Sequence, residues 1–194
     1  MSDNVVKPAR LRGRAVADRV EAAGWVAPGN GGPALYLICY RGCTDTQRLK
    51  AALFPDLLAA GVDLRVITIA RRDKPGVGFS TPVERTTVAE LWLRRDWDLA
   101  RRWDAAQPSD WTAEGIPPAD GDPEREAAVE AGRRLTDDLV PMLLADGLVE
   151  DHFRFPTLFW PTLSLEGVEG WSAMVCEDAD TWPVIRSTFG LNPA

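Results

Sequence analysis

Residues 34–46, Ala-Leu-Tyr-Leu-Ile-Cys-Tyr-Arg-Gly-Cys-Thr-Asp-Thr, join an apolar segment to the start of a predicted helix. The run 34–40 is rich in residues that favour β-strands, and it stops at Arg41-Gly42. Cys43 follows, shortly before a helix predicted over 46–60. A cysteine at a helix N-terminus lies beside unpaired backbone N–H groups and the positive end of the helix dipole. Both stabilise the thiolate, which is the reactive form of the side chain.

The predicted elements follow the order β-α-β, a helical insertion, and then β-β-α. A second strand at 63–70 follows the first helix, and two strands joined by one helix form a parallel pair with a right-handed crossover. The remaining patterns predict, in chain order, helices at 81–106 and 123–140, strands at 153–160 and 171–176 around a turn at 166–170, and a closing helix at 180–188. We therefore expect residues 1–33 to form a helix at 10–23 and a loop that lead into the domain. Residues 34–194 would form an α/β domain with a helical insertion at about 81–147.

Four segments of the chain carry a family resemblance. They are a lead-in to the first strand at 21–37, Cys43 itself, the segment 88–100 with the pattern Trp-x-x-x-Asp at Trp92 and Asp96, and Phe-Pro-Thr-Leu at 155–158. In these segments the chain resembles the thioredoxin-like catalytic domains of bacterial disulfide isomerases of the DsbC/DsbG type. The resemblance implies a thioredoxin-like fold, with Cys43 as the attacking cysteine and Pro156 as the family's cis-proline.

The chain departs from this family at four positions near the same segments. Thr46 stands where the family has the second cysteine of a Cys-x-x-Cys pair, so the two-thiol exchange cycle cannot run by its usual route. Tyr40-Arg41 replaces the family's Asp-Pro before the motif, and Phe155 replaces a small residue before the proline. If the site is active, it therefore acts as a monothiol.

The main hypothesis for function is a redox protein that acts through Cys43. The thiolate would form mixed disulfides with glutathione or with the thiol of a partner protein. In this interpretation Thr46 hydrogen-bonds the sulfur, and Phe155 and Pro156 shape the groove in which a substrate backbone pairs. A peroxidase would need a base or an arginine beside the cysteine, and Arg41 is the candidate. That class, however, usually has Thr or Ser three residues before the cysteine, where this chain has Tyr40.

The alternative hypothesis is a catalytically silent thioredoxin-fold module that binds a partner protein. It would use the Pro156 groove or the insertion, where Trp97 falls off the apolar face of the predicted helix and lies among arginines. Exposed tryptophan beside arginine is typical of protein–protein contact surfaces. The competing interpretation of Trp97 is that it packs under the link at 107–122.

Composition excludes several other classes. The net charge of −7 in 194 residues argues against nucleic acid as a partner, because phosphate binding needs a clustered basic surface. No apolar run approaches the length of about 20 residues that a membrane span needs. The first residues lack the pattern of a secretory signal, and three cysteines do not form a disulfide framework, so we expect a cytoplasmic protein. The oligomeric state is left open.

We expect no chemical role for the remaining cysteines or for the single histidine. Cys39 and Cys176 are expected in the core, because free cysteine is among the most buried residues. His152 is the only histidine, and the chain has no Cys-x-x-Cys pair, so we expect no metal site. No cofactor is expected either, with glutathione considered only as a co-substrate.

Overall fold

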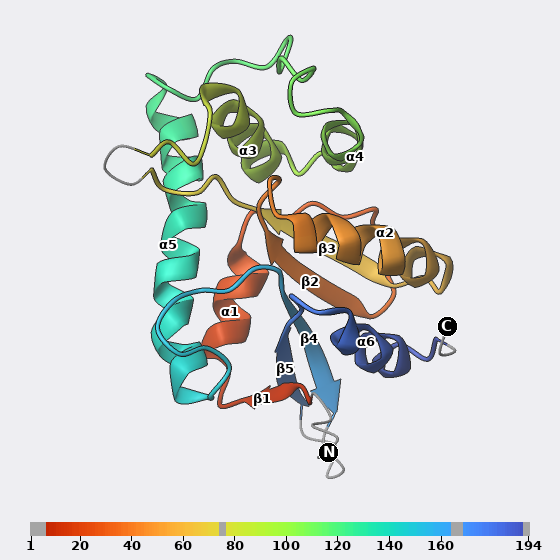
Figure 1. Ribbon diagram of the computed structural model, residues 1–194. Helices are drawn as coiled ribbons and strands as arrows, with labels where there is room; N and C mark the ends of the chain where they lie inside the picture. Colours follow the sequence, from red (N-terminus) through yellow and green to blue (C-terminus); the bar gives the residue numbers. More distant parts are fainter. Residues whose placement is uncertain (1–6, 74–76, 164–168, 192–194) are drawn as a thin grey trace.

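A computed structural model of the chain contains one mixed β-sheet with helices on both faces (Figure 1). It describes residues 7–73, 77–163 and 169–191. The strands are β1 (Ala9–Leu11), β2 (Ala34–Cys39), β3 (Asp63–Thr68), β4 (Thr157–Leu163) and β5 (Glu169–Val175). They lie in the order β1-β5-β4-β2-β3, with β2 and β3 parallel and the other pairs antiparallel.

The helices divide between the two faces of the sheet. They are α1 (Ala15–Ala22), α2 (Thr44–Ala59), α3 (Pro82–Arg94), α4 (Trp97–Ala105), α5 (Pro123–Ala145) and α6 (Trp182–Thr188), with a short 3-10 helix η1 (Ala179–Thr181) before α6. Helices α2 and α6 cover one face and α1 and α5 cover the other, while α3 and α4 lie beyond one end of the sheet (Figure 1). Because side chains alternate along a strand, β2 supplies both cores. Leu35 and Leu37 enter the core beneath α2, whereas Tyr36 and Ile38 enter the core beneath α1 and α5.

This topology is a thioredoxin-like fold, as the sequence predicts. The unit β2-α2-β3 is the predicted parallel β-α-β half, and its register runs from Ala34 opposite Asp63 to Cys39 opposite Thr68. The unit β4-β5-α6 is the predicted second half, and β4 joins the first half by pairing antiparallel with β2. The insertion helices α3, α4 and α5 stand between the two halves in sequence. Within the described residues, no helix is long and apolar enough to cross a membrane.

The N-terminal segment differs from the prediction. Instead of one helix over 10–23, the chain forms strand β1, turns at Gly13, and begins α1 at Ala15. Gly13 has a φ of 75°, which a glycine adopts without strain. The strand forms because β5 offers it an antiparallel edge, with Leu11 opposite Trp171.

The insertion also differs from the prediction. The single helix predicted at 81–106 is two helices, because Arg95 adopts a left-handed conformation that ends α3. The Asp96 carboxylate then accepts a hydrogen bond from the Leu99 N–H at 2.9 Å, which caps α4. Helix α5 continues through Pro141 to Ala145, because Leu139 and Leu143 on either side of the proline are both buried in the core.

The C-terminal strands begin and end at slightly different residues than predicted. The strand predicted at 153–160 is β4, which starts only at Thr157. The helix predicted at 180–188 is η1 followed by α6. Most of the turn predicted at 166–170 lies outside the described residues.

Candidate functional site around Cys43

Cys43 occupies the N-cap of α2, directly after the turn that ends β2. Its backbone is extended, with φ −81° and ψ 112°, and its sulfur accepts a hydrogen bond from the Thr46 N–H at 3.4 Å. The turn itself is closed by the Cys43 N–H, which donates to the Tyr40 carbonyl at 3.2 Å. The sulfur therefore meets one of the unpaired N–H groups of the first helical turn, where the helix dipole favours negative charge.

Two further groups contact the thiol from neighbouring segments. The thiol donates a hydrogen bond to the Phe155 carbonyl at 3.8 Å, and the Phe155–Pro156 peptide bond is cis. Tyr40 approaches from the end of β2. Burial, the negative charge of a Cys43 thiolate and a hydrogen bond to that side chain all raise the pKa of the Tyr40 hydroxyl. Tyr40 therefore keeps its proton at neutral pH and is a donor for the sulfur.

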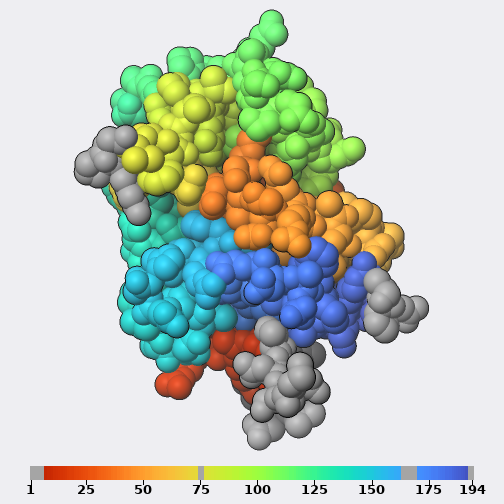
Figure 2. All heavy atoms as spheres, in the orientation of Figure 1, coloured from red at the N-terminus to blue at the C-terminus, as the bar shows by residue number. Residues whose placement is uncertain are grey.

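Aromatic rings cover this thiol. The rings of Tyr40 and Phe155 meet edge to face at 5.2 Å and an angle of 86°, and Phe153 packs against Phe155 at 4.9 Å. Cys43 beside them is only 5% exposed. The covering pair follows from strand register, because Ile38 pairs with Thr157 and two more residues along each strand bring Tyr40 opposite Phe155. In Figure 2 the orange segment of α2 reaches the surface between the insertion and the blue α6 segment.

Thr46 contacts the sulfur through its backbone and not through its side chain. The residue is 2% exposed, and its hydroxyl oxygen has no hydrogen-bond partner among the described residues. The sequence predicts a hydrogen bond between Thr46 and the sulfur, and the Thr46 backbone N–H donates it.

Arg41 lies next to the site but directs its charge elsewhere. Its guanidinium donates to the carbonyls of Trp103 and Ala106 at 2.8 and 2.7 Å, and it lies 5.1 Å from the Trp103 ring centroid. These carbonyls belong to the C-terminal end of α4, so Arg41 ties the insertion to the turn before Cys43. Burial lowers the pKa of Arg41.

Trp97, the remaining predicted binding residue, lies on a different surface. It begins α4, is half-buried, and lines a groove of about 1340 Å³ between α2 and α4. Phe54 and Trp103 line the same groove, whereas Phe155 and Pro156 do not. Cys43, Thr46, Phe155 and Pro156 therefore lie together at one site, while Arg41 borders the Trp97 groove.

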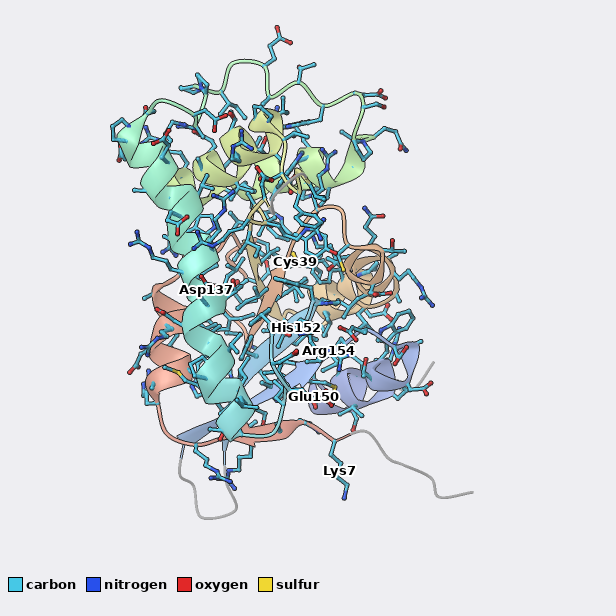
Figure 3. The ribbon with its side chains drawn as sticks, turned by 60° about the vertical axis from the view of Figure 1, so that its left-hand side comes forward. Lys7, Cys39, Asp137, Glu150, His152 and Arg154 are labelled. Carbon is cyan, nitrogen blue, oxygen red and sulfur yellow. The ribbon has the colours of Figure 1, made fainter. Side chains whose placement is uncertain are left out.

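The other two cysteines are protected. Cys39 and Cys176 are free thiols that are each 1% exposed. Burial raises the pKa of Cys39 to about 11 and the pKa of Cys176 to about 12. Both thiols therefore stay protonated at neutral pH. Figure 3 shows Cys39 inside the molecule, on the end of β2 that leads to Cys43.

His152 does not contact the thiol. It lies in the loop before β4 (Figure 3), its side chain is 74% exposed, and it pairs with its neighbour Asp151. No cluster of three or more His, Cys, Asp or Glu side chains that would suit a metal ion occurs in the described part of the chain.

Tyr40 is the site residue that sequence reasoning missed. The only available signal was its spacing, three residues before Cys43 across a Gly-containing turn. Its role depends on the pairing of β2 with β4, which no local pattern specifies.

Comparisons with known proteins find similarity to this chain among solved structures only. No protein-family model matches it, and no curated protein matches it. Among solved structures, it is similar to the DsbA of Chlamydia trachomatis, with 10% sequence identity and a TM-score of 0.35. The match covers 71% of this chain and 80% of that chain. The fold assignment stands on the strand order and connections described above.

Proposed function

We propose that this protein is a monothiol redox protein in which Cys43 exchanges disulfides with glutathione or with a partner protein. The observation that carries the proposal is the position of the Cys43 sulfur. It accepts the Thr46 N–H at the start of α2, and Tyr40, whose hydroxyl pKa is raised by burial and by Cys43, lies beside it. Hydrogen bonds to an ionised acceptor are the stronger kind, so the Thr46 N–H favours the thiolate.

The exchange needs only the Cys43 thiolate, a substrate disulfide and a second, free thiolate. The Cys43 thiolate attacks one sulfur of a disulfide, the S–S bond breaks, and the second sulfur leaves as a thiolate. A free thiolate then attacks the mixed disulfide, forming a new disulfide and releasing Cys43 as a thiolate. The partner disulfide formed in the second step carries the oxidising equivalents that entered in the first.

Resolution by an external thiol follows from the protected state of the other cysteines. Position 46 is threonine, and Cys39 and Cys176 are buried with pKa values raised to about 11 and about 12. Neither supplies a thiolate at neutral pH. Glutathione suits this requirement in the cytoplasm, where we propose the protein works.

The surroundings of Cys43 suggest how a substrate is received. The Tyr40–Phe155 ring pair covers the sulfur, so a disulfide reaches it only when these rings separate. The Phe155 carbonyl lies 3.8 Å from the sulfur, and this carbonyl and Pro156 would pair with a substrate backbone there. The resemblance of residues 155–158 to DsbC/DsbG-type domains supports this use of the Phe155–Pro156 segment.

The test is mixed-disulfide formation with glutathione disulfide, followed on the intact folded protein by mass spectrometry. We expect one glutathione per chain, mapped to Cys43 and removed by added glutathione. The Cys43→Ser variant should take up none, and Cys39→Ser should behave as the native protein. Absence of an adduct on the folded native protein would refute the proposal.

The second candidate is a silent binding module, and the groove between α2 and α4 favours it. Trp97, Phe54 and Trp103 give this groove an aromatic lining at a distance from the thiol. If binding is the function, Cys43→Ser leaves the affinity for a partner unchanged and Trp97→Ala weakens it. The reverse pattern supports the redox function.

A further inference from the structure

The guanidinium of Arg71 stacks on two aromatic rings. Arg71 follows β3 closely, and its guanidinium lies 4.0 Å from the Tyr40 ring centroid and 4.6 Å from that of Phe79. Stacking on aromatic faces is a favoured arrangement for a guanidinium. The guanidinium plane is attracted to the face of the ring, and its N–H groups at the edge stay free for hydrogen bonds.

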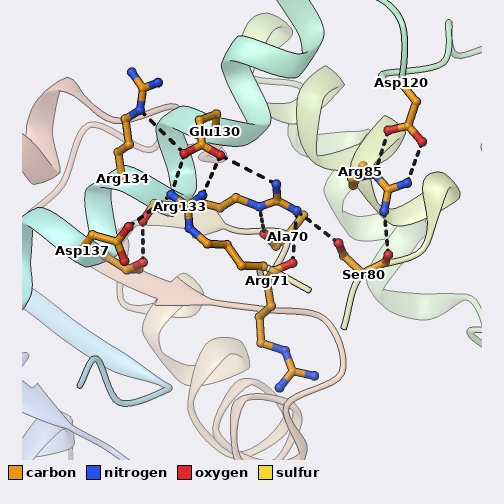
Figure 4. A network of polar contacts seen from close by, with 11 residues as sticks. Ala70, Arg71, Ser80, Arg85, Asp120, Glu130, Arg133, Arg134 and Asp137 are labelled. Atoms are coloured by element: carbon orange, nitrogen blue, oxygen red, sulfur yellow. Dashed lines mark hydrogen bonds and ion pairs between the residues drawn. The ribbon is translucent and has the colours of Figure 1, made fainter. Parts of the chain in front are cut away.

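The backbone beneath Arg71 is fixed by a second arginine. Arg133 of α5 donates to the Ala70 carbonyl at 2.9 Å and to the Arg71 carbonyl at 3.2 Å. Figure 4 shows this network, with the Arg71 side chain running away from it and no dashed line reaching its guanidinium. Hydrogen bonds from Arg133 therefore fix the backbone of Arg71, and the rings of Tyr40 and Phe79 position its guanidinium.

The charge of Arg71 has no acidic partner within the described residues. No carboxylate oxygen lies within 4 Å of its nitrogens, and its Nε is buried without a hydrogen bond there. The neighbouring Arg72, by contrast, pairs with both Glu130 and Asp137. Glu84 acts on Arg71 only at longer range. A half-buried guanidinium without a counter-ion is a recognition element for an incoming anion.

Tyr40 connects this cation to the reactive sulfur. One face of its ring carries Arg71, and its carbonyl accepts the Cys43 N–H at 3.2 Å. Arg71 is thus separated from the thiol by the width of a single side chain. A disulfide bound at Cys43 brings the groups next to its sulfur within reach of Arg71.

We infer that Arg71 makes Cys43 selective for thiols and disulfides that carry a carboxylate close to the sulfur. This inference rests on the proposed function, because it concerns the substrates of the same thiol. The carboxylate would accept hydrogen bonds from the free edge of the guanidinium while the disulfide lies at Cys43. Arg71 is a specificity residue in this account, and it takes no part in breaking the S–S bond.

The test compares three small disulfides that differ in charge. They are dithiodipropionate, bis(2-hydroxyethyl) disulfide and cystamine, which are anionic, neutral and cationic at pH 7. The rate of mixed-disulfide formation at Cys43 is measured at low salt by mass spectrometry. Each rate is divided by the rate of the same disulfide with dithiothreitol, which removes differences in intrinsic reactivity.

We expect the native protein to favour the anionic over the cationic disulfide by about tenfold, the size of effect that one screened charge at short range produces. Arg71→Gln should reduce this ratio to about one, and because the ratio compares two disulfides at the same thiol, it cancels any change in the cover over Cys43. Arg72→Gln, the matched control, should keep the native ratio. Added salt should lower the native ratio, which tests the inference even if Arg71→Gln fails to fold.

Two outcomes would overturn the inference, and they are distinguishable. If Cys43 reacts with the neutral disulfide but the charge ratio is near one, or is insensitive to salt and to Arg71→Gln, the selectivity is refuted and the redox function stands. If Cys43 of the folded protein reacts with none of the three, the redox function fails and the inference fails with it.

Discussion

Replacing Tyr40 by phenylalanine removes one hydroxyl from the thiol site and leaves the ring. The ring still packs on Phe155 and beneath Arg71, so the cover over the sulfur is kept. What is lost is the hydroxyl, whose pKa is raised by burial and by the neighbouring Cys43. A hydrogen bond to a group of this kind contributes about 1 kcal/mol net, which corresponds to about a fivefold change in the thiolate population.

The assay is the rate of iodoacetamide alkylation of Cys43 at pH 7 on the native protein. We expect Tyr40→Phe to slow it about fivefold, and the difference to vanish at a pH where the thiol is fully ionised. Tyr36→Phe is the matched control, because Tyr36 is the chain's only other tyrosine and its hydroxyl accepts a hydrogen bond from Arg65. An unchanged or faster rate in Tyr40→Phe would refute the role of the hydroxyl.

Three further predictions concern stability, each measured by urea unfolding. The folded-state pKa values of Cys39 and Cys176, about 11 and about 12, lie above the ordinary value of 9.0, so stability is complete below pH 9 and is lost as the pH rises towards them. We expect the free energy of unfolding to fall by about 1.4 kcal/mol per pH unit for each thiol. Cys39→Ala should halve this dependence on pH. A free energy of unfolding that stays constant between pH 9 and 11 would contradict the prediction. Arg41→Met removes two hydrogen bonds to α4 and should cost about 2–4 kcal/mol, against almost nothing for the exposed Arg48→Met; equal effects would show that the tie to α4 contributes nothing. Asp96→Ala removes the cap of α4 and should cost about 1 kcal/mol, with Asp96→Asn retaining most of the stability.

The sequence predicted the two halves of the fold because each half carries its own local pattern. The strand β2 and the helix α2 meet at Gly42-Cys43, and the apolar run of β3 follows one helix later. Strand β1 was missed because three residues give no periodicity, and its pairing partner β5 lies more than 150 residues away. Long-range pairing decides its structure.

The errors in the insertion have two different causes. The break between α3 and α4 has a local signal, since Asp96 stands three residues before Leu99 as a helix cap does, but the surrounding composition favours one continuous helix. At Pro141 a correct local rule is overridden by packing, because the core on both sides of the proline holds the helix together.

In the candidate site, too, the local sequence predicts some features and contacts between distant segments decide the others. Cys43 at the start of a helix could be derived from the order of residues alone. The approach of Tyr40 and Phe155 depends on the register of β2 with β4, and the position of Arg71 depends on the rings around it. These contacts join segments that are distant in sequence, so no local motif records them.

The most direct test of a reactive Cys43 is the pH dependence of alkylation at each of the three cysteines, read by mass spectrometry on the native protein. We predict that Cys43 is modified readily at pH 7, while Cys39 and Cys176 remain protected until the pH is strongly alkaline or the protein unfolds. A Cys43 that is inert at neutral pH, or that becomes reactive only together with the two buried thiols, would contradict the redox function and leave the binding module as the account of this protein.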